Sequence, residues 1–128
     1  MNQFSKLSNK MNQILSQKSD INNHQELKYN NGRYVGQVVN GLAEGKGIMY
    51  WNNGNRYEGE WRNNKKEGKG IKYFNNGGRY EGDFRNGKRE GKGIYYYNNG
   101  DRIEGDFKND VSEGKGIMFY SNGLIAYI

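Results

Sequence analysis

The sequence predicts an all-β repeat array: about four 23-residue β-hairpins in one elongated, twisted antiparallel sheet, with a short N-terminal amphipathic helix. Three observations support this prediction. One 23-residue pattern recurs in copies at 34–56, 57–79, 80–102 and 103–123. Glycines keep the same spacing in every copy, with aromatic residues beside them. Asn-Gly pairs, which favour tight turns, recur between the apolar segments.

Residues 1–28 lie outside this pattern and are read as a helix followed by a polar linker. A helix over residues 2–18 would be marginal alone in water, so it needs a surface to lie on. Three surfaces remain open: the first edge of the sheet, a groove of another protein, or a membrane. A fraying tail is the further alternative. The linker covers residues 19–28, where His24 is expected to be solvated. The apolar residues that share one face of the helix are Phe4, Leu7, Met11, Ile14 and Leu15.

The repeat domain is expected to cover residues 29–128. Residues 29–32 repeat the Tyr-Asn-Asn-Gly ending of the later copies, which indicates one additional pairing strand. In the second copy, the first strand is predicted at 57–62, the turn at 63–67 and the second strand at 68–74. Alternation places Tyr57 and Trp61 on one face of the first strand and Glu58 on the other.

Glycines recur inside the predicted strands, where they weaken a sheet unless a neighbouring group fills the space. An aromatic ring from a neighbouring strand is the natural filler, because it can lie flat over bare backbone. We therefore assign the recurring tyrosines and glycines to structure and not to a ligand site. The structural positions are Tyr34, Tyr57, Tyr80, Gly36, Gly59, Gly82, Gly105, Gly47, Gly70, Gly93 and Gly116.

The last five residues, 124–128, form an apolar segment that departs from the repeat: Ala126 takes the tyrosine position and Ile128 the glycine position. A short strand at the end of an open sheet leaves an edge that must be paired or covered. A partner strand, a second copy in a homodimer, or a local fold-back would each do this. The residues predicted at this edge are Leu124, Ile125, Tyr127 and Ile128.

The net charge of +6 is unevenly distributed along the chain. The predicted turns of the second and third copies are basic, whereas the turn of the fourth is not. Basic clusters can hold an acidic partner protein or an anionic membrane, and a solvated surface is the simpler alternative. The basic residues concerned are Lys65, Lys66, Lys69, Lys88, Arg89 and Lys92.

The sequence offers no set of catalytic residues, so we predict no enzyme activity, cofactor or metal site. The chain has no cysteine and one histidine, which excludes a thiol nucleophile and a His-Cys metal site. Glu58, Glu81 and Glu104 recur with the repeat and therefore belong to the sheet surface. The Gly-Lys-Gly segments lack the third glycine and the following helix of a dinucleotide loop. No nucleic acid partner is expected, since the glycine pairing already explains the aromatic residues.

The pattern Tyr-Glu-Gly, then Gly-Lys-Gly, then Asn-Gly-x-Arg resembles the MORN (membrane occupation and recognition nexus) repeat over residues 34–123. The resemblance implies stacked β-hairpins in a scaffold that binds protein partners in a multi-subunit assembly. It further implies the cytoskeleton, with the ciliary axoneme and radial-spoke-like complexes as the favoured setting. A cytoplasmic protein is expected because the sequence shows no signal peptide or transmembrane run. The alternative that it implies is a membrane-tethering module that binds acidic phospholipids or phosphoinositides.

Overall fold

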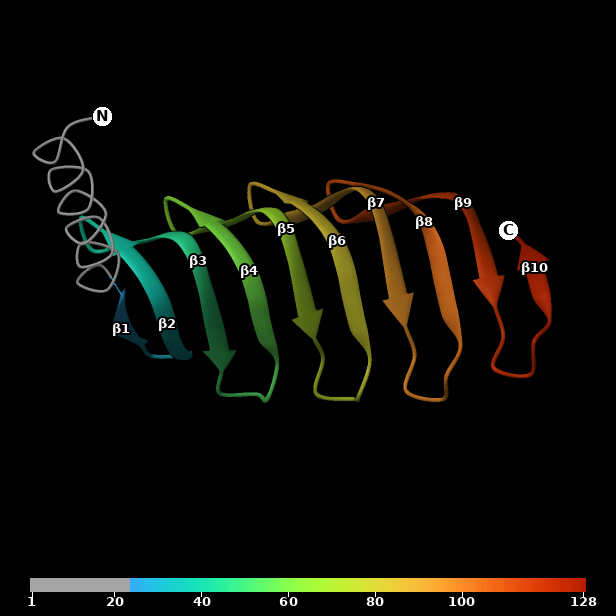
Figure 1. Ribbon diagram of the computed structural model, residues 1–128, viewed down its shortest axis with the longest axis horizontal. Coiled ribbons are helices and arrows are strands. Elements are labelled where there is room, and N and C mark those ends of the chain that lie inside the picture. Colours follow the sequence, from blue (N-terminus) through green and yellow to red (C-terminus); the bar gives the residue numbers. More distant parts are fainter. Residues whose placement is uncertain (1–23) are drawn as a thin grey trace, which may run out of the picture.

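The computed structural model describes residues 24–128, which form one antiparallel sheet of ten strands. Each strand pairs with the next strand along the chain, so the sheet is a continuous series of hairpins (Figure 1). Residues 24–128 contain no helix that could cross a membrane. The strands are β1 (His24–Tyr29), β2 (Gly32–Val39), β3 (Leu42–Trp51), β4 (Arg56–Arg62), β5 (Lys65–Tyr73), β6 (Arg79–Arg85), β7 (Lys88–Tyr96), β8 (Arg102–Lys108), β9 (Val111–Phe119) and β10 (Ile125–Tyr127).

The beginning of the sheet differs from the sequence prediction. The helix expected at 2–18, with its face of Phe4, Leu7, Met11, Ile14 and Leu15, lies outside the described residues. The linker expected up to Lys28 is wrong for residues 24–28, which form most of β1 and pair with β2. The additional strand predicted near Tyr29 is confirmed, and its Leu27 lies opposite Tyr34.

The turns within the repeats are shorter than predicted. The second repeat turns on two residues, Asn63 and Asn64, with φ of 48° and 67°. Positive φ at both central residues is the property of a type I′ turn, which joins two strands without disturbing their twist. The turn predicted at 63–67 is therefore wrong, because residues 65–67 already belong to β5. The corresponding pairs at 40–41, 86–87 and 109–110 also have positive φ.

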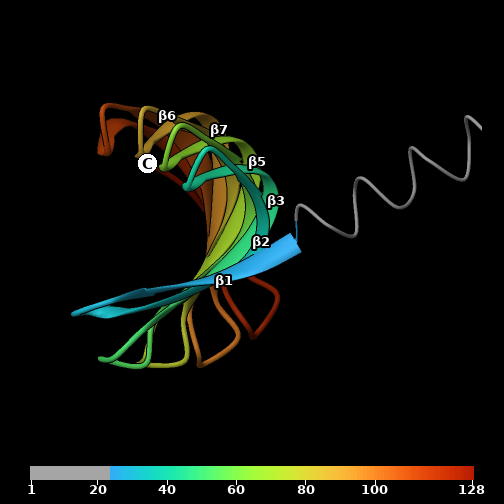
Figure 2. The same ribbon diagram turned by 90° about the vertical axis from the view of Figure 1, so that its left-hand side faces the viewer.

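The first glycine of each Gly-Lys-Gly segment has a different role from the glycines that the tyrosines cover. Gly45 and Gly68 have φ of 86° and 72°, beside the points where the pairing of the hairpin shifts by two residues. Such a bulge bends the strand and increases its twist. Because the bulge recurs in each of the four repeat hairpins, the strands bend along their length, and an end-on view shows the sheet as an open arc (Figure 2).

Successive hairpins are also joined at their ends. On the side of the four- and five-residue connections, Asn75 Nδ2 donates to the carbonyl of Asn53 at 2.8 Å, and Asn98 Nδ2 donates to that of Asn76 at 2.9 Å. On the side of the two-residue turns, the amide of Asn86 donates to Glu67 at 3.0 Å. The repeat therefore fixes the spacing of the loops as well as that of the strands.

Candidate binding face

One face of the sheet carries a continuous row of aromatic rings, and we call it the inner face. Neighbouring rings meet edge to face, with centroids 5.0–5.4 Å apart and interplanar angles of 82–89°. This geometry is the favoured one for aromatic pairs. The row runs through Tyr34, Trp61, Tyr57, Phe84, Tyr80 and Phe107.

The tyrosines of this row cover the paired glycines, as the sequence predicts. The Tyr57 ring occupies the space where a Cβ on Gly70 or Gly59 would lie. Its hydroxyl donates a hydrogen bond to the carbonyl of Glu60 at 2.9 Å. Burial raises the pKa of Tyr34 and of Tyr80 to about 12. The tyrosines are therefore core residues and are not available to a ligand.

Two lysines lie over the row on the same face. Lys66 Nζ is 5.3 Å from the centroid of the Trp51 ring and 5.8 Å from that of Phe84. Lys72 Nζ is 5.2 Å from the same Trp51 ring. Burial, and then the neighbouring charge of Lys72, lower the pKa of Lys66 to about 8. Two ammonium groups are thus held around one indole in partly desolvated surroundings.

The convergence of these side chains shows that the inner face is concave. Lys66 follows a two-residue turn and Trp51 lies at the opposite end of the hairpins, yet their side chains meet. A pocket of about 310 Å³ lies between them and includes Asn31 from one end of the hairpins and Asn64 from the other. The inner face is therefore a trough with aromatic walls and cations at its surface.

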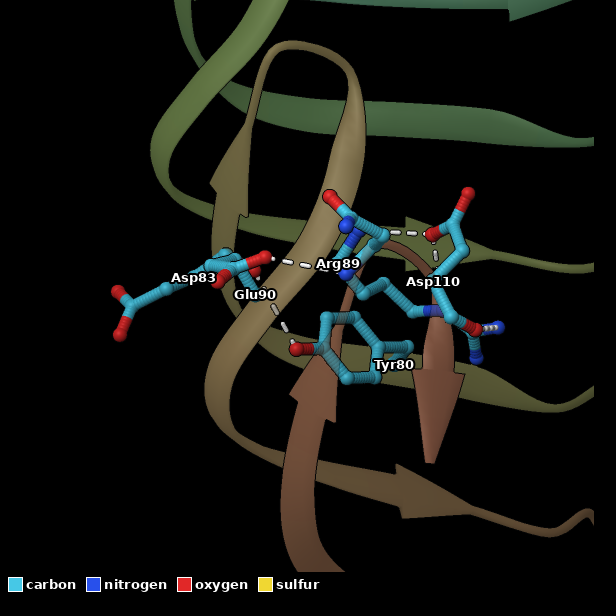
Figure 3. A network of polar contacts seen from close by, with 6 residues as sticks. Tyr80, Asp83, Arg89, Glu90 and Asp110 are labelled. Carbon is cyan, nitrogen blue, oxygen red and sulfur yellow. Dashed lines mark hydrogen bonds and ion pairs between the residues drawn. The ribbon is translucent and has the colours of Figure 1, made fainter. Parts of the chain in front are cut away.

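Lys66 and Lys72 differ from the other inner-face cation in having no acidic partner among residues 24–128. Arg89 is paired with Asp110, whose carboxylate lies 3.3 Å from Arg89 Nε and accepts from the Arg89 amide at 2.7 Å (Figure 3). Burial alone would raise the pKa of Asp110, but the bonds and charge of Arg89 lower it. The charge of Asp110 also raises the pKa of Lys66 and of Lys72, but Asp110 is bonded to Arg89 and forms no ion pair with either lysine.

The arginines of the opposite, outer face are both stacked and ion-paired. The Arg56 guanidinium stacks 3.7 Å from the centroid of Tyr73 and pairs with Glu58 at 3.1 Å. Arg79 repeats the arrangement on Tyr96, with Glu81 at 3.1 Å. Stacking and ion pairing together occupy each guanidinium, so this row stabilises the sheet surface and offers little to an anion.

The six basic residues predicted as loop ligands do not form one site. Lys66 and Arg89 point to the inner face, since they lie opposite Trp61 and Phe84. Lys69 and Lys92 lie opposite Asp83 and Asp106 on the outer face. The two others, Lys65 and Lys88, are exposed beside the two-residue turns. Alternation within the strands separated residues that are neighbours in the sequence.

Lys65 and Lys88 belong to a different cluster that the sequence analysis missed. Three further basic residues are exposed at the same end of the hairpins, and none of the five is paired with an acid of residues 24–128. Arg62 and Lys65 face each other across a two-residue turn. A comparison of these two positions in every copy of the repeat would have found the cluster. We call it the basic rim: Arg62, Lys65, Arg85, Lys88 and Lys108.

The C-terminal segment lies in the last strand of the sheet. β10 pairs with β9, and Ile128 exchanges two backbone hydrogen bonds with Gly116. Tyr127 is 83% exposed, and Ile125, on the same face, is 56% exposed. Leu124 and Ile128 are exposed as well, so all four residues predicted at this edge are accessible.

The fold and its glycine-tyrosine packing are those of a repeat family. The MORN repeat model matches residues 34–56, 57–79, 80–102 and 104–125, and the chain belongs to this family. No match to the chain was found among curated proteins. Within residues 24–128, no group of three or more His, Cys, Asp or Glu side chains could hold a metal ion.

Proposed function

We propose that this chain is a non-enzymatic adaptor that binds an acidic segment of a partner protein in its concave trough. The pair formed by Lys66 and Lys72 is the observation that carries the proposal. The two ammonium groups approach the same Trp51 ring at 5.3 and 5.2 Å, and neither forms an ion pair with an acid of residues 24–128. The lowered pKa of Lys66 indicates that its charge is held at a cost.

A carboxylate seated between these lysines would remove that cost. It would neutralise the repulsion between Lys66 and Lys72 and restore the pKa of Lys66 toward its usual value. The aromatic walls of the trough would bury the apolar part of an acidic side chain. Because the trough runs along the repeats, it suits an extended or helical segment better than a single small molecule.

Poly-L-glutamate provides a direct probe of this proposal. Both tryptophans of the chain, Trp51 and Trp61, line the pocket, so their fluorescence reports on binding there. We expect a saturable change that weakens with salt. The double variant Lys66→Gln with Lys72→Gln should lower the affinity at least about tenfold, which corresponds to about 1.4 kcal/mol.

The matched control is Lys65→Gln with Lys88→Gln, which removes the same charge from the basic rim. These substitutions should leave most of the affinity in place. Equal losses in the two double variants would mean non-specific attraction and would contradict the proposal. The absence of any fluorescence change at low salt would contradict it as well.

We further propose that the adaptor works in the cytoplasm as part of a cytoskeletal assembly, with the ciliary axoneme as the favoured setting. Membership of the MORN family and the cationic trough with its aromatic walls support this proposal. Affinity purification of the tagged chain from its own cells, followed by mass spectrometry, tests it. Cytoskeletal or axonemal proteins should be recovered with the wild type and lost with the Lys66→Gln, Lys72→Gln variant. Recovery of the chain with membranes alone would contradict this setting.

The basic rim favours a second candidate function, which is attachment to a membrane that contains acidic phospholipids or phosphoinositides. Five exposed basic residues on three successive hairpins could contact anionic headgroups, with about 1 kcal/mol for each. Sedimentation with phosphatidylcholine vesicles, with and without phosphatidylserine or phosphoinositide, tests the idea. Lys65→Glu with Lys88→Glu should abolish binding, whereas the Lys66→Gln, Lys72→Gln variant should retain it. No binding at low salt would exclude this function.

A further inference from the structure

We infer that the fourth repeat receives a tyrosine side chain of the partner protein, in a hollow beside Ile103. This inference rests on the proposed function, because it assumes that a partner lies in the trough. The first three repeats each place their own tyrosine at this position, and the fourth repeat has Ile103 instead. The structure shows what this single difference removes.

The glycine pair of the fourth repeat has no ring over it. A Cβ built on Gly47, Gly70 or Gly93 would meet the ring of that repeat's tyrosine. A Cβ built on Gly105 or Gly116 would meet only backbone atoms. The β-carbon positions that a tyrosine covers elsewhere are therefore uncovered by any described side chain in this repeat.

A hollow of about 390 Å³ occupies this part of the inner face. Ile103 and Gly105 lie at its base, and Tyr95 and Phe107 contribute aromatic walls. Ser112 also lines it, at the position that Lys66 and Arg89 fill in the preceding repeats. Two small side chains in place of larger ones thus create the space.

The hollow lacks one ring of the aromatic row. Trp61 and Phe84 each contact a tyrosine on both sides, at 5.0–5.4 Å. Phe107 contacts Tyr80 at 5.2 Å and has no tyrosine on its other side among residues 24–128. A ring entering the hollow would meet the free edge or face of Phe107 and complete the row.

The hydrogen-bond pattern favours a phenol over a plain phenyl ring. Each inner-face tyrosine donates to the carbonyl three residues later: Tyr34 to Gln37 at 2.7 Å and Tyr57 to Glu60 at 2.9 Å. The equivalent acceptor in the fourth repeat is the carbonyl of Asp106. Two charged residues line the hollow: Arg89, which is already paired with Asp110, and the exposed Lys115. The carbonyl of Asp106 is the acceptor that favours a phenol there.

The probe for this site is p-cresol, the side-chain analogue of tyrosine, observed by ¹H–¹⁵N NMR of the full chain. We expect saturable shifts of the amides of Gly105, Asp106 and Phe107 below about 10 mM. Toluene, which lacks the hydroxyl, should bind at least about threefold more weakly. Ile103→Tyr and Ile103→Phe should each remove the shifts by filling the hollow, whereas Ile103→Val should retain them.

The outcomes separate this inference from the proposed function. The Lys66→Gln, Lys72→Gln variant should still bind p-cresol, and Ile103→Tyr should still bind poly-L-glutamate. Absence of saturable p-cresol shifts at these amides would overturn the inference. So would shifts that map to the pocket at Trp51, or shifts that persist in both Ile103→Tyr and Ile103→Phe. If the wild-type chain does not bind poly-L-glutamate but does bind p-cresol at these amides, the proposed function alone is overturned.

Discussion

At the scale of the residue, three tyrosines explain how a chain with only 33% hydrophobic residues builds a core. Tyr34, Tyr57 and Tyr80 are 1%, 0% and 0% exposed. Each ring covers two glycines, contacts one or two further rings and satisfies its hydroxyl within the hairpin. Large aromatic side chains bury much apolar area per residue. A few fixed positions therefore bury the apolar area that a globular core distributes over many residues.

Tyr57 is therefore the residue whose truncation should cost the most. Tyr57→Ala would remove a ring that contacts Trp61 and Phe84, and we expect a loss of about 3–5 kcal/mol in unfolding free energy. Tyr57→Phe keeps the ring but loses the hydrogen bond to Glu60, for about 1 kcal/mol. Urea unfolding measures both. Tyr127→Ala, at an 83% exposed position, should stay within about 0.5 kcal/mol, and an equal loss there would contradict this ranking.

The same residues predict how stability depends on pH. Tyr34 and Tyr80 have a folded pKa of about 12 against 10 when unfolded, so the stabilisation that they provide is complete below pH 10 and is lost between pH 10 and 12. Lys66 has a folded pKa of about 8 against 10.5 when unfolded. The unfolded chain then binds more protons between these values, and stability rises with pH there.

The expected profile is thus a shallow rise in unfolding free energy from about pH 8 to 10, followed by a fall. Urea unfolding at a series of pH values measures it. The variant Lys66→Met should lose much of the rise, with a remainder from Lys72, whose pKa burial also lowers, and should keep the fall. A profile of Lys66→Met that matches the wild type between pH 8 and 10 would show that Lys66 is not desolvated in the trough.

The sequence predicts the tyrosine and glycine positions well but the basic residues poorly. A ring beside a strand glycine has one reasonable arrangement, and it recurs in each of the first three copies. The placement of Lys66 depends on a turn of two residues instead of five. Asn63 and Asn64 both adopt positive φ, and an Asn-Asn pair predicts a two-residue turn less strongly than Asn-Gly does. Side chains alternate between the two faces from the first residue after the turn. The length of the turn therefore decides which basic residues share a face.

At the scale of the element, the hairpins interlock through their turn residues. Asn64 Oδ1 accepts a hydrogen bond from the amide of Ala43 in the preceding hairpin at 2.7 Å. Asp110 does the same for Arg89 at 2.7 Å. Gly87 occupies the equivalent position between them and has no side chain to offer. Asn64 and Asp110 thus shape the turn of their own hairpin through their positive φ, and they bond to the preceding hairpin through their side chains.

Replacing Asn64 separates these two effects. Asn64→Gly retains the positive φ and loses the acceptor for Ala43, so we expect a loss of about 1 kcal/mol in unfolding free energy. Asn64→Asp keeps the acceptor and should remain within about 0.5 kcal/mol of the wild type. Urea unfolding measures both, and amide exchange at Ala43 should increase in the glycine variant alone. A stabilised glycine variant would show that turn geometry outweighs the link between hairpins.

At the scale of the whole molecule, the array is a one-dimensional object in which each hairpin contacts chiefly its neighbours. The one-strand start at β1 was predictable from the repeated Tyr-Asn-Asn-Gly, but its extent was not, because residues 24–28 lack the repeat pattern. Curvature was also beyond the sequence analysis, since it arises from bulges at glycines such as Gly68. The trough is a product of that curvature, which brings Lys66, beside a two-residue turn, to Trp51 at the other end of the hairpins.

A one-dimensional array should tolerate the loss of one whole repeat. Deleting residues 59–81 joins Glu58 to Gly82 and preserves the pattern, so the chain should still fold, with the sheet shortened by two strands or about 10 Å. Deleting residues 59–80 removes one residue fewer and shifts every following side chain to the other face, so that variant should unfold or lose most of its stability. Circular dichroism and small-angle X-ray scattering measure these outcomes.

The same deletions locate the binding function along the array. Removing residues 59–81 also removes Lys66 and Lys72, so the folded variant should lose poly-L-glutamate binding. Removing residues 82–104 joins Glu81 to Gly105 and keeps both lysines, and this variant should bind as the wild type does. The two deletions shorten the sheet equally, so a difference between them reflects the trough residues and not length. Equal binding by both would place the acidic partner elsewhere on the molecule.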